Sequence, residues 1–345
     1  MKKQDTITFL ILTGVLLIAL SLDLLVGSVY IPMKDVLEIL GGGPAANPGW
    51  KTIILEFRVP KAATAILAGS GLAMSGLLMQ TIFKNPLAGP FVLGISSGAS
   101  LGVALLVLAG NIFGIAVTQL TFLGSWATVL SAIAGSTIVL VLIVTVSVAI
   151  VDGMTLLIIG LMVGSLSGAL VSVLQYYSEA HEIQSYLIWT FGNLGGVHDS
   201  ELVILFITVL VGLFWSWGFS KPLNAFLLGE SYARSLGVNI RRTRLVVIII
   251  TSILAGGITA FCGPLAFIGI AIPHLARIVF KTANHRVLIP GCILLGAIVM
   301  TACDLVSQIP GSSRTLPINA ITSLLGAPAV IAILIKNRNL SKSFT

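Results

Sequence analysis

The sequence predicts an all-α, polytopic membrane protein with about ten transmembrane helices and with both termini in the cytoplasm. Composition is the first reason, because 57% of the 345 residues are hydrophobic and only 9% are charged. Soluble domains normally carry about a quarter charged residues, so lipid must replace water over most of this surface. Long apolar runs such as LVVIIITSILAGGITAF are the second reason, since strands of a membrane barrel would alternate instead.

The spans can be placed in order along the chain. The first apolar segment is longer than the core of a secretory signal, and no A-x-A-like cleavage site follows it, so we expect an uncleaved helix. Windows of about twenty apolar residues continue from there to the C-terminal tail. The predicted spans are 7–27, 62–82, 91–109, 121–145, 155–175, 200–217, 245–261, 264–280, 287–306 and 317–335.

The basic residues predict the orientation of these spans. With the N-terminus inside, the outer segments hold only Lys34, Lys51, Arg58, Lys61 and Arg314. The other 14 of the 19 Lys and Arg residues fall in cytoplasmic segments, as the positive-inside rule requires. An odd number of helices would scramble this partition. The net charge of +7 therefore reflects membrane topology, and no nucleic-acid partner is expected.

No motif predicts catalysis, a cofactor or a metal site. The GISSG stretch at 94–98 matches G-x-S-x-G, but that motif requires an α/β-hydrolase sheet, which this chain cannot build. HEIQS at 181–185 is not H-E-x-x-H, and the three cysteines lie in apolar runs without ligand spacing. The sequence lacks a G-x-x-x-x-G-K-[ST] loop, so any ATP must be bound by another subunit.

Small residues recur at helical spacing in GSGLAMSG, GISSGASLG and GSLSGALVS. In lipid such residues let helix backbones approach closely. They predict tight packing within one bundle, or a bundle that shifts between two packings or lines a path, and the sequence leaves these alternatives open.

The longest polar interruption on the inner side spans residues 221–244. Its middle predicts a short amphipathic helix, with Ala225, Leu228, Tyr232 and Leu236 on one face and Gly237 at its end. A simple connection would not need an apolar face. The helix either lies on the membrane surface or docks into a groove on a cytoplasmic partner.

Four blocks resemble the membrane subunits of type II ABC importers, the permeases that take up iron–siderophore complexes, haem and cobalamin. The first is RVPKAATAILAGSGLAMSGLLMQTIFKNPLAGPFVLGISSGASLG at 58–102, and the second is LLGESYARSLGVN at 227–239. The third is FCGPLAFIGIAIPHLARIVFKTANHRVLIPGCILLGA at 261–297, and the fourth is LPINAITSLLGAPAVIAIL at 316–334. The blocks occur in the family's order and are spread from residue 58 to residue 334, so the resemblance extends over nearly the whole chain.

This resemblance implies one permease domain over residues 1–345, in a cell membrane, paired with a second permease subunit that is identical or paralogous. Two cytoplasmic ABC ATPase subunits and an extracytoplasmic substrate-binding protein are the other implied partners. The 221–244 segment becomes the loop that couples the permease to the ATPase, and its matching positions are Leu228, Gly229, Glu230, Arg234, Leu236 and Gly237. The segment Asp152, Gly153, Met154 and Thr155 matches the position of the family's cytoplasmic gate.

The outer face carries a second set of implied site residues. Arg58 and Lys61 match positions where the family meets carboxylates of the binding protein, although anchoring to lipid headgroups is an alternative. Many relatives carry a further arginine where this chain has Gln308, and Arg314 is a candidate replacement. The resemblance also marks a structural motif at Asn85, Pro86, Pro273, His274 and Arg277.

The function expected from the resemblance is transport without bond chemistry, so the chain is not itself an enzyme. A ferric siderophore is the expected cargo, with haem or cobalamin as the alternative. An ion-coupled secondary transporter is the rival from another class, and it would need paired acids or bases around a midplane site. Only Asp23 and Asp304 lie within or near a span, which argues against that rival.

Overall fold

The computed structural model describes residues 3–44, 47–109, 125–149, 153–197, 199–308 and 315–336. Within these ranges the chain is helical, and its one pairing of extended backbone is an isolated bridge between Gln308 and Thr315. Seven helices are long and apolar enough to cross a membrane, and three shorter apolar helices accompany them. Each overlaps one of the predicted windows, which confirms the all-α, polytopic fold class.

The membrane helices are α1 Lys3–Leu25, α4 Val59–Ile82, α5 Ile95–Leu108, α6 Ser125–Ala149, α7 Gly153–Tyr177, α9 Asp199–Gly218, α12 Ile240–Cys262, α13 Ile268–Phe280, α14 His285–Ser307 and α15 Ile318–Lys336. The connections contain α2 Met33–Leu40, α3 Pro48–Thr52, α8 Ala180–Thr190, α10 Ser220–Leu227 and α11 Glu230–Ser235, together with a π-helical stretch η1 Ile53–Arg58 and a 3-10 turn η2 Pro90–Leu93.

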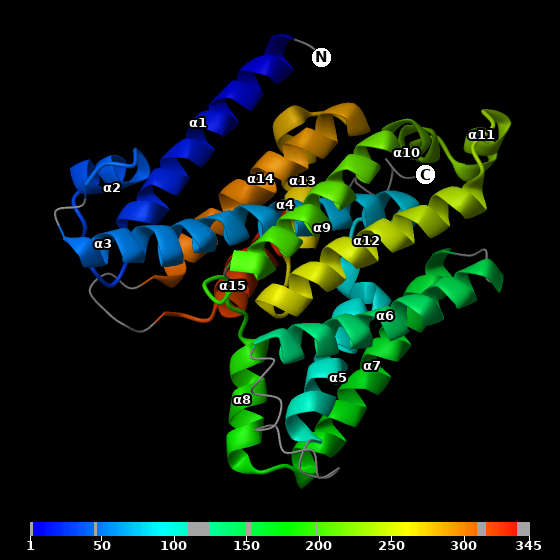
Figure 1. The fold of residues 1–345 in the computed structure, drawn as a ribbon. Helices are drawn as coiled ribbons and strands as arrows, with labels where there is room; N and C mark the ends of the chain where they lie inside the picture. Colours follow the sequence, from blue (N-terminus) through cyan, green and yellow to red (C-terminus); the bar gives the residue numbers. More distant parts are fainter. Residues whose placement is uncertain are drawn as a thin grey trace.

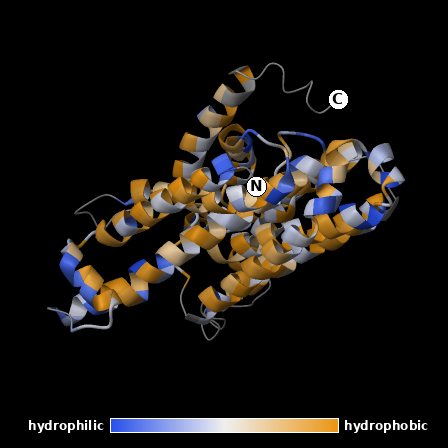
Figure 2. Cartoon of the chain, turned by 90° about the horizontal axis from the view of Figure 1, so that it is seen from above, coloured by the Kyte–Doolittle hydropathy of each residue, from blue (hydrophilic) through white to orange (hydrophobic). Residues whose placement is uncertain are grey.

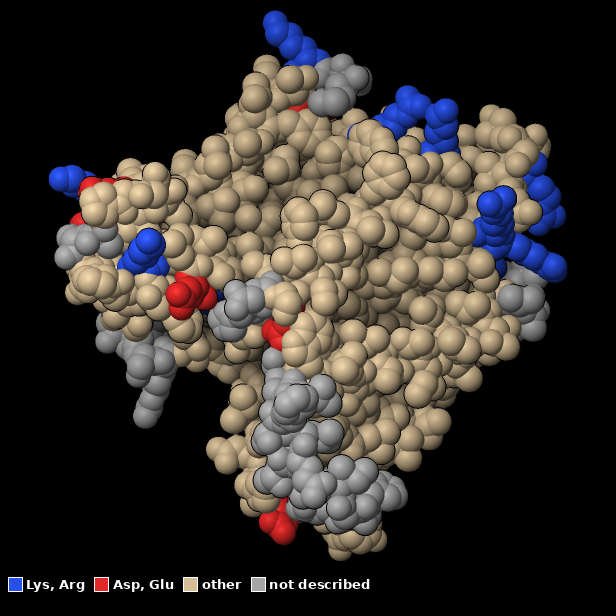
Figure 3. All heavy atoms as spheres, viewed as in Figure 1, with Lys and Arg blue, Asp and Glu red and all other residues tan. Residues whose placement is uncertain are grey.

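The connections sort to opposite ends of the bundle. The helices α2, α3 and α8 lie at one end and α10 and α11 at the other, as the predicted alternation of outer and inner segments requires (Figure 1). Hydrophobic residues cover most of the helices between these ends (Figure 2). Figure 3 shows a broad uncharged expanse between basic side chains at the inner end and mixed charges at the outer end.

The helix α4 forms the centre of the bundle. It packs against α9, α12, α13 and α14, and 89% of the most apolar stretch of the continuous helix Pro48–Ile82, which ends with α4, is buried. Close approach depends on glycine: a Cβ on Gly69 would lie 2.1 Å from the carbonyl oxygen of Gly296, and one on Gly76 would lie 1.6 Å from that of Gly269. The small residues of α4 therefore serve tight packing within one chain.

The polar stretch after α4 is a compact turn. Lys84 has a left-handed φ of 45°, and the side chain of Asn85 accepts a hydrogen bond from the backbone N–H of Leu87 at 2.9 Å. Pro90 begins η2, and Gly94, with a φ of 73°, turns the chain into α5. The predicted span 91–109 is therefore a 3-10 turn followed by a short helix. Gly98 and Gly102 of this helix lie against Gly135 and Ser131 of α6.

Candidate functional site

The cytoplasmic segment forms two helices where the sequence predicted one. Gly229 takes a φ of 109°, which only glycine adopts readily, and it separates α10 from α11. Leu228, Tyr232 and Leu236 are exposed, whereas Ala225 on α10 is buried against the bundle. The predicted single helix was therefore wrong, although Ala225, Leu228 and Leu236 still line one hollow. Gly237, with a φ of 79°, ends α11.

Two charged residues of this segment have different surroundings. Glu230 begins α11 and pairs with Arg244 of α12 at 2.8 Å, and the side chain of Arg244 is only 6% exposed. Arg234 is exposed on α11. Glu230 thus fixes α11 to a membrane helix, while Arg234, Leu228 and Leu236 face outward from the protein.

The predicted gate segment lies beside the turn that follows α4. Asp152 falls outside the described residues, and α7 begins at Gly153, where a Cβ would lie 3.2 Å from the ring of Phe83. Met154 is exposed, and Thr155 is half-buried. The described part of this segment therefore contacts the inner end of α4.

The residues of the predicted structural motif converge on the same end of α4. His274 of α13 is hydrogen-bonded through Nε2 to the carbonyl oxygen of Pro86 at 2.9 Å. Arg277 donates to Oε1 of Gln80 at 2.6 Å, and Gln80 donates to the carbonyl of Ile270 at 3.1 Å. Gln80 was not predicted, although a fully buried glutamine near the end of an apolar helix is a signal for such a role.

Pro273 explains one of the close contacts of α4. Proline has no N–H, so the carbonyl of Gly269, four residues earlier, lacks its usual helical donor. That carbonyl faces Gly76 of α4 at the point of closest approach between the two helices. His274 follows Pro273 in α13, and its ring joins α13 to the turn after α4.

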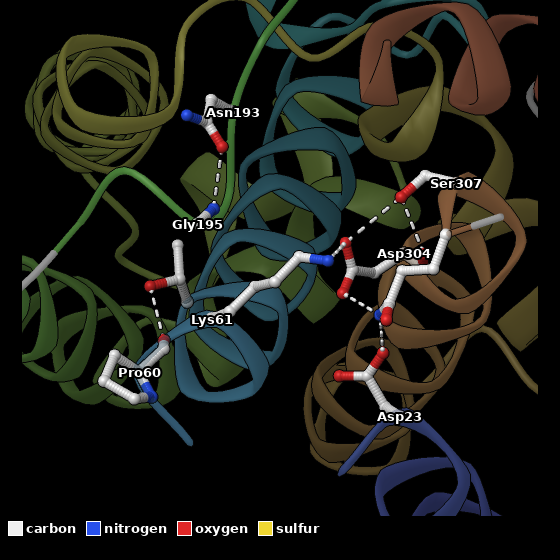
Figure 4. A network of polar contacts seen from close by, with 9 residues as sticks. Asp23, Pro60, Lys61, Asn193, Gly195, Asp304 and Ser307 are labelled. Atoms are coloured by element: carbon white, nitrogen blue, oxygen red, sulfur yellow. Dashed lines mark hydrogen bonds and ion pairs between the residues drawn. The ribbon is translucent and has the colours of Figure 1, made fainter. Parts of the chain in front are cut away.

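At the outer end, Lys61 lies in a network of buried acids (Figure 4). Its Nζ is 3.0 Å from Oδ1 of Asp304, whose side chain is only 2% exposed. Gln308 donates from Nε2 to Asp23 at 2.8 Å and to Asp304 at 3.2 Å. The two acids singled out by the sequence therefore meet, but at the outer end of α1 and α14, and both are held by side chains of this network.

Arg58 ties the outer ends of α1 and α4 together. Its guanidinium donates to the carbonyl oxygens of Leu24 at 2.6 Å and Leu25 at 3.1 Å, and also to that of Val29. These carbonyls lie at and just beyond the C-terminal end of α1, where no further N–H group of the helix can donate to them. Arg314 falls outside the described residues.

A cavity of about 390 Å³ opens beside this network. Its polar lining includes Arg58, Lys61, Asn193, Asp304 and Gln308. Asn193 belongs to the loop after α8, and its side chain accepts a hydrogen bond from the N–H of Gly195 at 2.8 Å. Segments from four parts of the chain thus border a charged hollow on the outer side.

The remaining polar groups give no reacting centre among the described residues. Ser96 of the GISSG stretch is hydrogen-bonded to Thr259 at 3.1 Å in a buried position. His181 lies on the surface 3.4 Å from Glu179, and His198 falls outside the described residues. No group of three or more His, Cys, Asp or Glu side chains able to hold a metal occurs in the part of the chain described.

Comparisons with known proteins agree with this architecture. Residues 15–336 match the model of the FecCD transport family. The vitamin B12 import system permease protein BtuC of Salmonella typhi is 35% identical over 338 residues, which are 97% of each chain. The protein of the same name from Salmonella paratyphi A is 34% identical over the same extent.

Two solved structures share the fold. An inward-facing conformation of a metal-chelate type ABC transporter superposes with a TM-score of 0.82 and 29% identity, covering 95% of this chain and 98% of that chain. A structure of PsaBC from Streptococcus pneumoniae superposes with a TM-score of 0.52 and 17% identity, covering 89% of this chain and 99% of that chain, and it supports the fold alone.

Proposed function

Because the chain belongs to the FecCD transport family of ABC importer permeases, we propose that it carries a metal chelate of the cobalamin class across the cytoplasmic membrane. The observation that carries this proposal is its similarity, along nearly the whole chain, to vitamin B12 permeases. The relatives therefore favour the cobalamin alternative over the ferric siderophore expected from the sequence. Haem, which the sequence grouped with cobalamin as the alternative cargo, is a second candidate.

The proposed division of labour leaves ATP hydrolysis to two separate cytoplasmic ATPase subunits. The sequence has no nucleotide-binding loop of the P-loop type. The exposed Leu228, Tyr232, Leu236 and Arg234 provide an apolar surface with a cation, which suits docking into a groove of a cytoplasmic subunit. Glu230 and Arg244 would pass movement of α11 to α12 through their ion pair.

The exposed side of α7 supports the proposal of a second permease subunit, identical or paralogous. Small residues Ser165, Gly168 and Ser172 are exposed there, and a Cβ on Gly168 would meet nothing within 4 Å. Small residues permit close helix packing in lipid, so this face suits another membrane helix. The translocation path would then run between the two copies.

The outer cavity supports docking of an extracytoplasmic binding protein. Arg58 and Lys61 line it and could exchange their present partners for carboxylates on that protein. The predicted contribution of Arg314 stays a prediction.

Transport by the reconstituted complex tests the proposal. The chain is placed in proteoliposomes with its ATPase and binding protein, and uptake of cyanocobalamin, haem and a ferric siderophore is compared with ATP and without an ion gradient. ATP-dependent accumulation of cyanocobalamin supports the proposal. Accumulation of the siderophore alone would overturn the choice of cargo, and uptake by the isolated chain on an ion gradient would overturn the importer.

A further inference from the structure

A chain of hydrogen bonds, partly buried at Asn224 and fully buried at Thr81, links α10 to the ends of two membrane helices. Asn224 of α10 accepts through Oδ1 from the backbone N–H of His285 at 2.8 Å and lies 2.9 Å from Nδ1 of the same residue. Nε2 of His285 lies 2.8 Å from the hydroxyl of Thr81. His285 is the first residue of α14, and Thr81 is in the last turn of α4. One imidazole therefore contacts α10 and α4 from the end of α14.

The hydrogen-bond pattern fixes the orientation of the groups in this chain. Nδ2 of Asn224 donates at 2.9 Å to Oδ1 of Asn284, which also accepts from the N–H of Arg286. Oδ1 of Asn224 must then be the acceptor that faces His285, so the imidazole carries its proton on Nδ1. The hydroxyl of Thr81 lies 2.8 Å from Nε2 of His285 and 2.8 Å from the carbonyl oxygen of Leu77, so its one proton is donated to one of these two acceptors at a time.

The contact between His285 and Thr81 is buried, whereas Asn224 at the other end of the chain of bonds is partly exposed. His285 and Thr81 are each only 1% exposed, so neither can replace its partner with water. On the other side, α10 is joined to α11 by Leu228 and Gly229 alone. The proposed ATPase-docking surface is therefore one short connection away from a rigid contact with the central helix.

We propose that His285 is a positioning residue that makes α10 move together with α4 and α14, so that displacement of the docking surface reaches the core of the permease. This inference rests on the proposed coupling to an ATPase. The links run in series, from Asn224 to His285 and from His285 to Thr81. Breaking either link should therefore interrupt transmission to α4, and breaking both should do no further harm.

Four single variants and one double variant test this arrangement in the reconstituted complex. His285→Asn keeps an amide near the position of Nδ1 and loses the contact with Thr81. His285→Gln keeps an amide near Nε2 and loses the side-chain contact with Asn224, although the backbone N–H of residue 285 still donates to Asn224. Thr81→Val and Asn224→Ala remove the same two links from the other side. We expect each to lower cyanocobalamin uptake per ATP hydrolysed about tenfold, and the Thr81→Val/Asn224→Ala double variant to match the singles.

Two further variants serve as controls. Thr81→Ser keeps the hydroxyl and should retain wild-type coupling. Thr251→Val removes a buried hydroxyl of α12 that has no hydrogen-bond partner in the described structure, and it should also leave coupling unchanged. Two results would overturn the proposal in favour of a purely structural role. In one, the loss of uptake per ATP in the double variant equals the product of the losses in the two single variants. In the other, Thr81→Ser is as defective as Thr81→Val.

A second readout separates this inference from the choice of cargo. A cysteine introduced by Ser28→Cys lines the outer cavity, whereas the native cysteines are buried. We expect ATP to change the rate at which a polar maleimide labels this cysteine, and we expect the His285 variants to lose that response while ATP hydrolysis continues. A response retained in both His285 variants would overturn the inference, whichever chelate is transported.

Discussion

The helices α4 and α7 carry the same kind of small-residue pattern, GSGLAMSG in the one and GSLSGALVS in the other, yet the structure uses them differently. The apolar window of α4 is 89% buried, whereas that of α7 is 28% buried. Gly69 and Gly76 of α4 meet the backbones of α14 and α13, while Gly168 of α7 meets nothing. Gly164, at the start of the α7 pattern, still lies against Ser97 of α5, so the pattern leaves only one side of α7 open.

The difference shows what a small-residue pattern encodes. It permits close approach of a second backbone but does not say whether that backbone belongs to the same chain. In α4 the neighbours are supplied by segments about 200 residues later in the sequence, as with Ser70 and the carbonyl of Ile293. In α7 the side that carries Gly168 remains available for a partner subunit or for lipid.

The largest effect should follow from adding one methyl group to α4. In Gly76→Ala the Cβ would fall 1.6 Å from the carbonyl oxygen of Gly269, so the two helices must separate. We expect a loss of about 3 kcal/mol in the free energy of unfolding, measured by denaturation in detergent. The matched variant Gly168→Ala, in the interior of α7 with open space at the site, should cost no stability and should raise the free energy of unfolding by up to about 1 kcal/mol. Equal effects at the two glycines would erase the distinction between the helices.

The order of the helices could be predicted from the sequence because hydropathy and basic charge act locally. Ten windows and the partition of Lys and Arg were sufficient, without knowledge of any contact. The division of the segment into α10 and α11 at Gly229 was missed because the spacing of apolar residues continues across this glycine. The positive φ of Gly229 depends on how α10 packs. A glycine followed by an acidic residue that can begin a new helix was the available signal.

The polar networks at the two ends of α4 could not be predicted from local pattern. Asp23 and Gln308 are 285 residues apart in the sequence, and Thr81 and His285 are 204 residues apart. Their pairing depends on which helices become neighbours, and the sequence singled out Asp23 and Asp304 only as the acids that lie within or near a span. The family motif included His285, but without structure nothing in it indicates a contact with α10.

The next effect concerns the outer end of α4. Lys61→Met leaves Asp304 buried without its cation, and we expect a loss of about 2 kcal/mol, because Lys61 is itself partly exposed. The double variant Lys61→Met/Asp304→Leu removes both charges and should recover most of the stability, since apolar replacements of a buried pair are often neutral. Thermal unfolding of the purified permease measures both. A double variant no more stable than Lys61→Met would show that the loss in the single variant does not come from leaving Asp304 unpaired.

A smaller effect, and one confined to assembly, is expected on the exposed face of α7. Gly168→Phe fills open space, so the unfolding free energy of the permease should change by less than about 0.5 kcal/mol. If this face meets a second permease, the bulky ring should keep the helices apart and weaken the pair by about 1 kcal/mol. Chemical crosslinking in membranes against the same protein with Gly168→Ala measures the difference. Unchanged crosslinking would assign this face to lipid.

The smallest effect should appear just after α7, where burial resumes in α8. Tyr186 is buried on α8, whereas Tyr176 and Tyr177 at the end of α7 are exposed. Burial raises the pKa of the Tyr186 phenol, and a hydrogen bond with Ser100 acts in the opposite direction. The folded protein thus holds this proton more tightly than the unfolded chain, whose phenol has a pKa of about 10.

The resulting stability is complete below that value and declines as the pH rises through it toward the pKa of the folded state. Tyr186→Phe should therefore flatten part of the fall in melting temperature between about pH 9 and pH 11. Melting of the two proteins in parallel, with the difference between them plotted against pH, isolates the contribution of this residue. A difference in melting temperature that does not vary with pH would mean that Tyr186 has the same pKa in the folded and unfolded protein. Its burial on α8 would then have no effect on its ionisation.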